Sequence, residues 1–295
     1  MPPNNSNSKS AWTRQMQSLR LQVDQIDLRI LKLLQQRTDL SRQIGKAKRL
    51  HRAAIYVPER EHELLVRLIR RSGGKPSAKA IEAIYREIFS SSRDAQGQPE
   101  IGLLQASAPA IISPARWYLG ACDRFVLKGR WTELAHGLQT GTLTTVLLTG
   151  TDLARLLQKT LAFRYFLDHL TIIGDFPAGG GPAFPLSQRV FIVAPQRKKV
   201  FLETNRALIL IKCKSTANAV KSLLHAMPVH FIQAKSLSLR AKPAPGTMVF
   251  NLVRLTLARP VDGIHAANQL LAASRAADLS LSILGTYLGT EDYAG

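Results

Sequence analysis

The chain has 295 residues, 45% of them hydrophobic, which is enough to form two or three domains with buried cores. Cys122 and Cys213 are its only cysteines, and they are far apart without metal-ligand spacing, which argues against a disulfide-rich fold and a cysteine zinc site. The sequence has neither a signal-peptide pattern nor an apolar run of membrane-spanning length, so we expect a cytoplasmic protein.

The formal net charge of +20 raises the question of a nucleic-acid or acidic partner. The basic residues are spread along the chain, without an RNP-like aromatic motif, a zinc finger or a basic tail. The densest run, GKAKRLHR (45–52), is also explained by a solvated helix end, where cations suit the negative end of the helix dipole. We therefore rank nucleic-acid binding below an enzymatic function and keep it as the alternative of a different class.

The first 13 residues are polar and predict a disordered leader. From about Ser18 to Leu50 the pattern predicts one long helix, roughly 45–50 Å at 1.5 Å per residue. Two rows at heptad spacing run along it: Val23, Ile30, Arg37 and Ile44, and beside them Ile26, Leu33, Leu40 and Ala47. A helix of this length must bury its stripe against other long helices or against a second copy of itself.

Arg37 interrupts the apolar stripe with a charge, and Lys48, about three helical turns further on, points in nearly the same direction. An unpaired charge facing a core costs several kcal/mol, so an anionic group should meet these cations. Arg37 could instead extend out of the bundle or pair with a glutamate of a neighbouring helix, and the helix pattern alone leaves both interpretations open.

Two shorter helices are predicted next. Pro58 suits the first turn of the second helix, whose apolar face is Leu64, Leu65, Leu68 and Ile69. Ser77 is a candidate cap for the third helix, whose stripe is formed by Ile81, Ile84, Tyr85 and Ile88. Ser92 and Gln96 continue that stripe, either as a fraying helix end or, together with Arg37 and Lys48, as part of a polar site inside the bundle.

After about Ile101 the pattern changes to alternating short strands and helices, which predicts a small α/β domain. Its predicted strands are RFVL, TTVLLTG, LTIIGDF and RVFIVAP, and its predicted helices are WTELAHGLQTG and TDLARLLQKTLAFRYFL. The last segment reads as βαββαβ: RALILIKCK, ANAVKSLLHAM, VHFIQAKSLSL, MVFNLVRLTLA, GIHAANQLLAASRA and LSLSILGTYL. This order predicts an α+β domain.

The runs SLRLQVDQIDLRILKLLQQRTDLSRQIGKAK, YVPEREHELLVRL and AIYREIFSSSRDAQ resemble the all-helical chorismate mutases. In particular, they resemble the mutase domain that opens the bifunctional chorismate mutase–prephenate dehydratases. The resemblance covers about residues 14–98. It implies an intertwined helical dimer that rearranges chorismate to prephenate without a metal or cofactor, by orientation and preorganised electrostatics.

The same resemblance implies a role for each matching residue. Arg37 would hold a substrate carboxylate, Lys48 and Gln96 would bracket the ether oxygen, and these three are the candidate catalytic residues. Ser92 would bind a carboxylate, Glu61 would accept from the ring hydroxyl, and Arg20 would reach the site from the partner subunit. Arg60 belongs to the matching Arg-Glu pair. Val57 departs from the pattern, because some members of the family carry an aspartate there.

The C-terminal half resembles the dehydratase and ACT regulatory parts of the same bifunctional enzymes, with departures. The order βαββαβ and the closing LGTYL are similar to an ACT domain, which implies that the middle segment is the dehydratase part. That segment has about half the expected length, and Gln188 stands where the Thr-Arg-Phe motif has its threonine. ANAV (217–220) and the stretch Lys235–Ser238 replace the two phenylalanine-binding motifs.

We therefore predict a leader (1–13), an all-α three-helix chorismate mutase domain (14–98), a truncated dehydratase-like α/β domain (99–200) and an ACT-like domain (201–289). The expected function is chorismate mutase, with C-terminal domains that do not catalyse. The alternatives are an enzyme that retains dehydratase activity, and a basic regulatory or nucleic-acid-binding protein.

Overall fold

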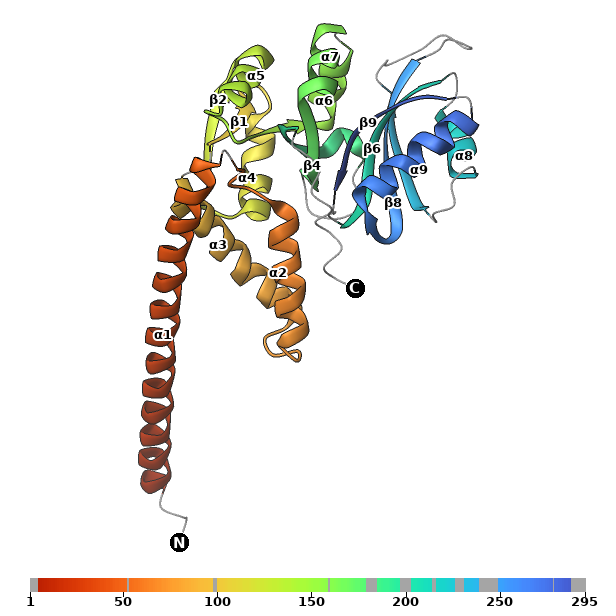
Figure 1. The fold of residues 1–295 in the computed structure, drawn as a ribbon. Helices are drawn as coiled ribbons and strands as arrows, with labels where there is room; N and C mark the ends of the chain where they lie inside the picture. Colours follow the sequence, from red (N-terminus) through yellow and green to blue (C-terminus); the bar gives the residue numbers. More distant parts are fainter. Residues whose placement is uncertain are drawn as a thin grey trace.

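A computed structural model describes residues 5–51, 53–97, 100–158, 160–178, 185–196, 203–213, 216–225, 231–238, 249–277 and 279–287. Within these residues, three helices are followed by two sheets with their own covering helices (Figure 1). No helix in this part of the chain is both long and apolar enough to cross a membrane. A helical part followed by α/β parts confirms the coarse prediction.

The first helix, α1 (Asn5–Leu50), has 46 residues and begins well before Ser18. The prediction of a leader is therefore wrong for residues 5–13, which are helical, while residues 1–4 lie outside the described residues. No proline or glycine occurs between Asn5 and Gly45, and extending an existing helix is easier than nucleating one. The polar composition of residues 5–13 is therefore compatible with a helix.

The second and third helices lie where the sequence predicts them. Helix α2 (Pro58–Arg71) has its proline in the first turn, and α3 (Ala78–Gly97) is capped by Ser77, whose Oγ accepts from the Ala80 N–H at 3.3 Å. Leu65, Ile81 and Phe89 form a small core between α2 and α3.

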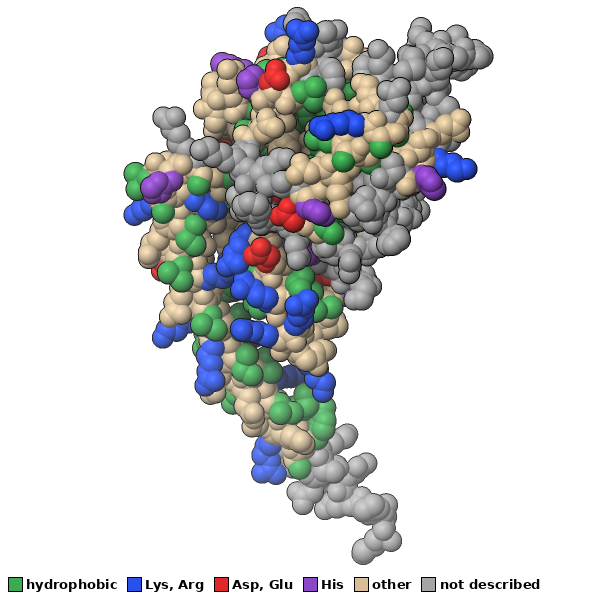
Figure 2. Space-filling model, turned by 45° about the vertical axis from the view of Figure 1, so that its right-hand side comes forward, with side chains coloured by type: hydrophobic (Ala, Val, Ile, Leu, Met, Phe, Trp, Pro, Cys, Tyr) green, Lys and Arg blue, Asp and Glu red, His purple; other side chains and the backbone are tan. Residues whose placement is uncertain are grey.

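The two ends of α1 differ in their surroundings. Its C-terminal end packs against α3, and its N-terminal part extends beyond α2 and α3 (Figure 1). Large hydrophobic side chains along α1 are exposed in the single chain: Trp12, Leu19, Leu21, Val23, Ile26, Leu28, Ile30, Leu31, Leu33, Leu34, Leu40, Ile44 and Leu50. Figure 2 shows hydrophobic side chains on the surface of the projecting helix.

The first sheet has five strands in the order β2-β1-β3-β5-β4. The strands are β1 (Glu100–Leu104), β2 (Arg124–Lys128), β3 (Thr145–Thr149), β4 (Leu170–Pro177) and β5 (Arg189–Pro195). β1 pairs in parallel with β2 and β3, whereas β5 runs antiparallel to β3 and β4. Its helices are α4 (Ala108–Leu119), α5 (Trp131–Thr140), α6 (Gly150–Leu157) and α7 (Thr160–His169), and the turn η1 (Leu186–Gln188) precedes β5.

Two elements of this part were not predicted, and two helices were predicted as a single helix. β1 and α4 are absent from the prediction, and the single helix expected over TDLARLLQKTLAFRYFL is two helices, α6 and α7. α4 carries Pro109 in its first turn and Pro114 in its interior. Because proline disfavours the interior of a helix, the sequence of this segment does not predict one.

The second sheet is antiparallel, with the strand order β7-β8-β6-β9. Its elements are β6 (Glu203–Cys213), α8 (Thr216–His225), β7 (Phe231–Ser238), β8 (Val249–Asp262), α9 (Gly263–Ala276) and β9 (Ser280–Tyr287). The predicted order βαββαβ is confirmed, with the strand pairing of a split βαβ unit. The ACT-like identity of this part stays a prediction.

The two sheets share one core and one buried ion cluster. Asp175 on β4 pairs with Arg189 on β5, with Arg206 on β6 at 3.0 Å and with Arg254 on β8 at 2.8 Å. Burial raises the pKa of Asp175, but the three arginines outweigh burial and hold the pKa below its ordinary value. Leucines from both sheets also belong to one apolar cluster between them, and each sheet has a further cluster of its own.

Candidate active site

The site begins where α1 and α3 approach most closely, at Gly45. A Cβ atom at this position would lie 2.2 Å from the carbonyl oxygen of Gln96, so only glycine allows this separation of the two helices. Arg49, one turn further along α1, donates to the same carbonyl at 2.7 Å. The end of α3 is therefore fixed against the end of α1.

Lys48 and Gln96 meet as a consequence of this close contact. Lys48 Nζ donates to Gln96 Oε1 at 2.8 Å and to the carbonyl oxygen of Ile55 at 3.0 Å. An ammonium group can bond only to the oxygen of an amide, so this bond makes Nε2 the end of Gln96 that is available to donate. Gln96 is buried and Lys48 half-buried.

Arg37 and Ser92 form a second contact between α1 and α3. Arg37 Nη1 donates to Ser92 Oγ and, at 3.3 Å, to the carbonyl oxygen of Ile88, and its guanidinium lies 5.8 Å from the centre of the Phe89 ring. Ser92 Oγ donates in turn to the Ile88 carbonyl at 2.7 Å. Arg37 therefore points at α3 and not away from the bundle.

Glu61 on α2 is held by a residue of α3 that the sequence analysis did not select. Arg93 Nη1 donates to both carboxylate oxygens of Glu61, at 2.6 and 2.7 Å. Burial raises the pKa of Glu61, and Arg93 counteracts this most strongly, with a smaller contribution in the same direction from Lys48. Burial lowers the pKa of Arg37, and Glu61 is among the groups that oppose this shift. Glu61 thus lies within the electrostatic field of both α1 cations.

The structure brings five of the seven predicted site residues to the junction of the three helices: Arg37, Lys48, Glu61, Ser92 and Gln96. The other two are elsewhere in the single chain. Arg20 is exposed on the projecting part of α1, and Arg60 is exposed beside Glu63, 3.4 Å away on the same helix.

Sequence reasoning missed Arg93 and Arg49. Arg93 directly follows Ser92, and its position beside a polar stripe could have drawn attention to it, but its partners Leu119 and Asp123 belong to the next domain. Arg49 lies in the basic run at the end of α1, where a solvated cation is the ordinary expectation. Within the described residues, no group of His, Cys, Asp and Glu side chains could hold a metal ion.

In the comparison with known proteins, residues 19–97 match the model of the family "Chorismate mutase type II". The chain carries a chorismate mutase domain at its N-terminal end. The matched segment contains all seven predicted site residues. It begins inside α1 and ends at the C-terminal residue of α3, so it lies entirely within the three-helix part of the structure.

Among curated proteins, the chain is similar to the bifunctional chorismate mutase/prephenate dehydratase of Aquifex aeolicus (strain VF5). The two are 34% identical over 110 residues, which is 36% of this chain and 30% of that protein. The chain thus matches less than a third of the length of this relative.

Two solved structures are similar at the level of overall shape. The prephenate dehydratase of Streptococcus mutans is 11% identical, with a TM-score of 0.40 over 64% of this chain and 98% of that one. GqqA, described as a quorum quenching acylase, is 12% identical, with a TM-score of 0.40 over 65% and 95% of the two chains. Similarity of this extent carries no information about the chemistry of this chain.

Proposed function

We propose that the protein is a chorismate mutase, which rearranges chorismate to prephenate in the biosynthesis of the aromatic amino acids. One observation carries this proposal: the segment that matches the mutase family brings Arg37, Lys48, Ser92 and Gln96 together between α1 and α3. These are cationic and hydrogen-bonding groups, as a dicarboxylate substrate with a charge-accumulating ether oxygen requires.

The reaction is an intramolecular rearrangement in which the ether C–O bond breaks while a C–C bond forms. No proton or electron is exchanged with the protein, so its work is orientation and stabilisation of the negative charge that grows on the ether oxygen. Lys48 Nζ and Gln96 Nε2 donate to that oxygen. Arg37 and Ser92 bind a carboxylate, and Glu61 accepts a hydrogen bond from the ring hydroxyl.

The active form in this proposal is a homodimer in which α1 of one copy packs along the partner. The exposed hydrophobic stripe of α1, which includes Val23, Ile26, Ile30 and Leu33, supports this, because single soluble chains rarely expose so continuous an apolar surface. Arg20 lies about 25 Å along α1 from Arg37, at 1.5 Å per residue. Arg20 therefore serves the site of the partner subunit.

The C-terminal domains have no catalytic role in this proposal, and prephenate is the final product. Gln188 occupies the position of the catalytic threonine of the dehydratases, and Arg189, the next residue, is fully buried in the ion cluster around Asp175. Phenylalanine has no site in the ACT-like part, because Lys235–Ser238 replaces its recognition motif. The alternative is a bifunctional enzyme that converts prephenate further to phenylpyruvate.

Incubation of the purified protein with chorismate tests the proposal. We expect chorismate to disappear, and prephenate to accumulate without enzyme-dependent phenylpyruvate at neutral pH. A buffer control must measure the spontaneous acid-catalysed breakdown of prephenate. Formation of phenylpyruvate by the protein would establish the bifunctional alternative. Failure to consume chorismate would contradict the mutase function, and salt-dependent binding of duplex DNA would then favour the nucleic-acid alternative.

A further inference from the structure

Helix α3 packs against α1, α2 and α4 and carries polar groups on two faces. One face presents Ser92 and Gln96 to α1, as described above. The other face presents Glu87, Ser90 and Arg93 to the loop between α4 and β2. The mutase site and the α/β domain therefore contact opposite sides of one helix.

The loop is bound to α3 through its backbone. The N–H of Ala121 donates to Glu87 Oε2 at 3.0 Å, and the N–H of Cys122 donates to Ser90 Oγ at 3.0 Å. Gly120 precedes them with a φ of 98°, and a Cβ atom there would lie 2.4 Å from the Cβ of Ser90. This glycine allows the loop to lie directly on the helix.

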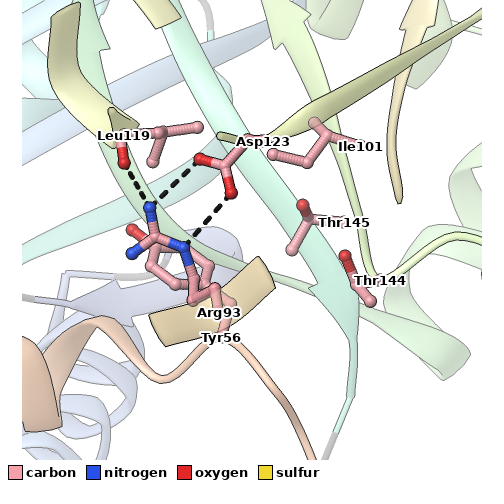
Figure 3. Close-up of a pocket in the computed structure, with 7 residues that line it drawn as sticks. All are labelled: Tyr56, Arg93, Ile101, Leu119, Asp123, Thr144 and Thr145. Atoms are coloured by element: carbon pink, nitrogen blue, oxygen red, sulfur yellow. Dashed lines mark hydrogen bonds and ion pairs between the residues drawn. The ribbon is translucent and has the colours of Figure 1, made fainter. Parts of the chain in front are cut away.

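Arg93 is the deepest contact between the two parts. All three nitrogens of its guanidinium donate hydrogen bonds. Nη1 donates to both oxygens of Glu61, Nη2 donates to the carbonyl of Leu119 and to Asp123 Oδ2 (3.0 Å), and Nε donates to Asp123 Oδ1 at 3.3 Å. Figure 3 shows the guanidinium pointing at the Asp123 carboxylate and the Leu119 carbonyl, beside the Tyr56 ring.

Only 3% of Arg93 is exposed, so its guanidinium is covered by protein and does not reach a substrate. Its effect on the site must pass through Glu61. Both oxygens of Glu61 accept from Arg93, which fixes the plane of the carboxylate, and each oxygen keeps a further lone pair for another donor. The Glu61 side chain remains 25% exposed, so an O–H group can reach it.

We propose that Arg93 is a positioning residue of the mutase site, and that Asp123 of the α/β domain holds Arg93 in place. The α/β domain thereby orients Glu61 toward the hydroxyl group of the substrate and contributes to the selection of hydroxyl-bearing substrates. This inference rests on the proposed mutase function and deepens it: the first sheet is part of the mutase site and not merely attached to it.

The pH dependence of activity should also depend on the contact between Arg93 and Glu61. The charged groups that face Glu61 are Arg93 on α3, Lys48 and Arg37 on α1, and Asp123 in the loop. Burial raises the pKa of Glu61, and Arg93 lowers it. Loss of the Arg93 charge therefore raises this pKa, and the acidic limb of kcat/KM moves to higher pH.

The test measures kcat/KM for chorismate and for an analogue whose ring hydroxyl is replaced by hydrogen. In Arg93→Gln we expect kcat/KM for chorismate to fall by about 10- to 100-fold, the usual value of a hydrogen bond to a charged group, with little change for the analogue. Asp123→Asn should reduce the preference for the hydroxyl in the same direction but less. Arg93→Lys should restore part of it, because a lysine still supplies a cation to Glu61.

Glu87→Ala is the matched control, because it removes a contact of the same loop with the same helix and leaves Arg93 and Glu61 intact. It should keep the wild-type preference for the hydroxyl and the wild-type pH profile. If Arg93→Gln fails to fold by circular dichroism, Asp123→Asn carries the test, since it is nearly isosteric and lies outside the helical domain.

The outcomes separate the two claims. A wild-type protein that does not convert chorismate contradicts the mutase function itself. If the wild-type protein is active and both Asp123→Asn and Arg93→Gln keep its preference for the hydroxyl, only the inference about Arg93 is overturned. Equal losses for both substrates in these variants would also overturn it, because they would show a purely structural role for the cluster.

Discussion

The two halves of α1 follow the same heptad pattern but have different environments. From Arg37 to Leu50 the helix packs on α3, Gly45 allows close contact, and the charged side chains Arg37, Lys48 and Arg49 all bond to the neighbouring helix or connection. Before Arg37 the helix extends alone, with Leu33 64% exposed. In the proposed dimer, the packed part of α1 supplies its site residues within one chain, whereas the projecting part supplies Arg20 to the partner.

This difference shows which part of the proposal one chain can support. The large apolar side chains stay exposed along both parts of the helix, Leu40 and Ile44 included, and an exposed apolar stripe of this length supports the proposed interface with a second copy. The polar residues in the stripe, by contrast, find their partners within the same chain. Substitutions before Arg37 therefore test the proposed interface, and substitutions from Arg37 to Leu50 test the reaction centre.

The largest effect is expected from a charge in the exposed stripe. Leu33→Asp would place one unpaired carboxylate per chain in the proposed interface, each at a cost of roughly 3–5 kcal/mol. We expect the dimer to dissociate and the mutase activity to be lost with it. Light scattering and activity should be measured together on the same samples.

Lys32→Asp is the control for this variant, because Lys32 is adjacent in sequence but lies outside the two apolar rows. It should remain dimeric and active. An active monomer with Leu33→Asp would contradict the proposed role of the exposed half of α1.

In the packed half, Lys48→Ala removes a donor from the ether oxygen. The loss of one such donor typically costs about 10²- to 10³-fold in kcat, and we expect a value in this range. Lys46→Ala, on the exposed side of the same turn, should leave kcat unchanged. A similar kcat for both variants would remove Lys48 from the reaction centre.

Gln96→Glu should make the activity depend on pH. The introduced carboxyl group donates to the ether oxygen only while protonated, and once ionised it repels the charge that grows there. Activity should therefore fall as pH rises through the pKa of this group, ordinarily about 4.3, whereas the wild-type activity should not fall with rising pH in this range. Burial raises this pKa and Lys48 lowers it, but the sign of the change is the same in either case. A flat profile at wild-type activity would exclude contact of Gln96 with the ether oxygen.

The sequence predicted the packed half of the site better than its surroundings. Arg37, Lys48, Ser92 and Gln96 interrupt apolar stripes at helical spacing, which made them candidates for a polar site, and the family resemblance decided between this site and a solvated position. Arg93 could not be found in this way. Its partners Leu119 and Asp123 follow in another domain, and only the tertiary fold brings them to α3.

The fold was predictable where periodicity is strong. α2, α9 and the strands β2 to β5 lie close to their predicted positions. α4 was not predicted, because Pro109 and Pro114 mask its helical pattern, and β1 is a short strand beside a polar turn. The start of α1 was placed too late, because composition does not show how far a nucleated helix extends.

The most direct measurement mixes two inactive variants. Arg20→Ala disables the contribution of the projecting half of α1, and Arg37→Ala disables the packed half. After co-refolding of the two variants, some heterodimer sites receive both wild-type arginines, one from each chain. We predict that mutase activity reappears in the mixture while each variant alone stays inactive. No recovery in mixtures shown to contain heterodimer would contradict a site shared between two copies of α1.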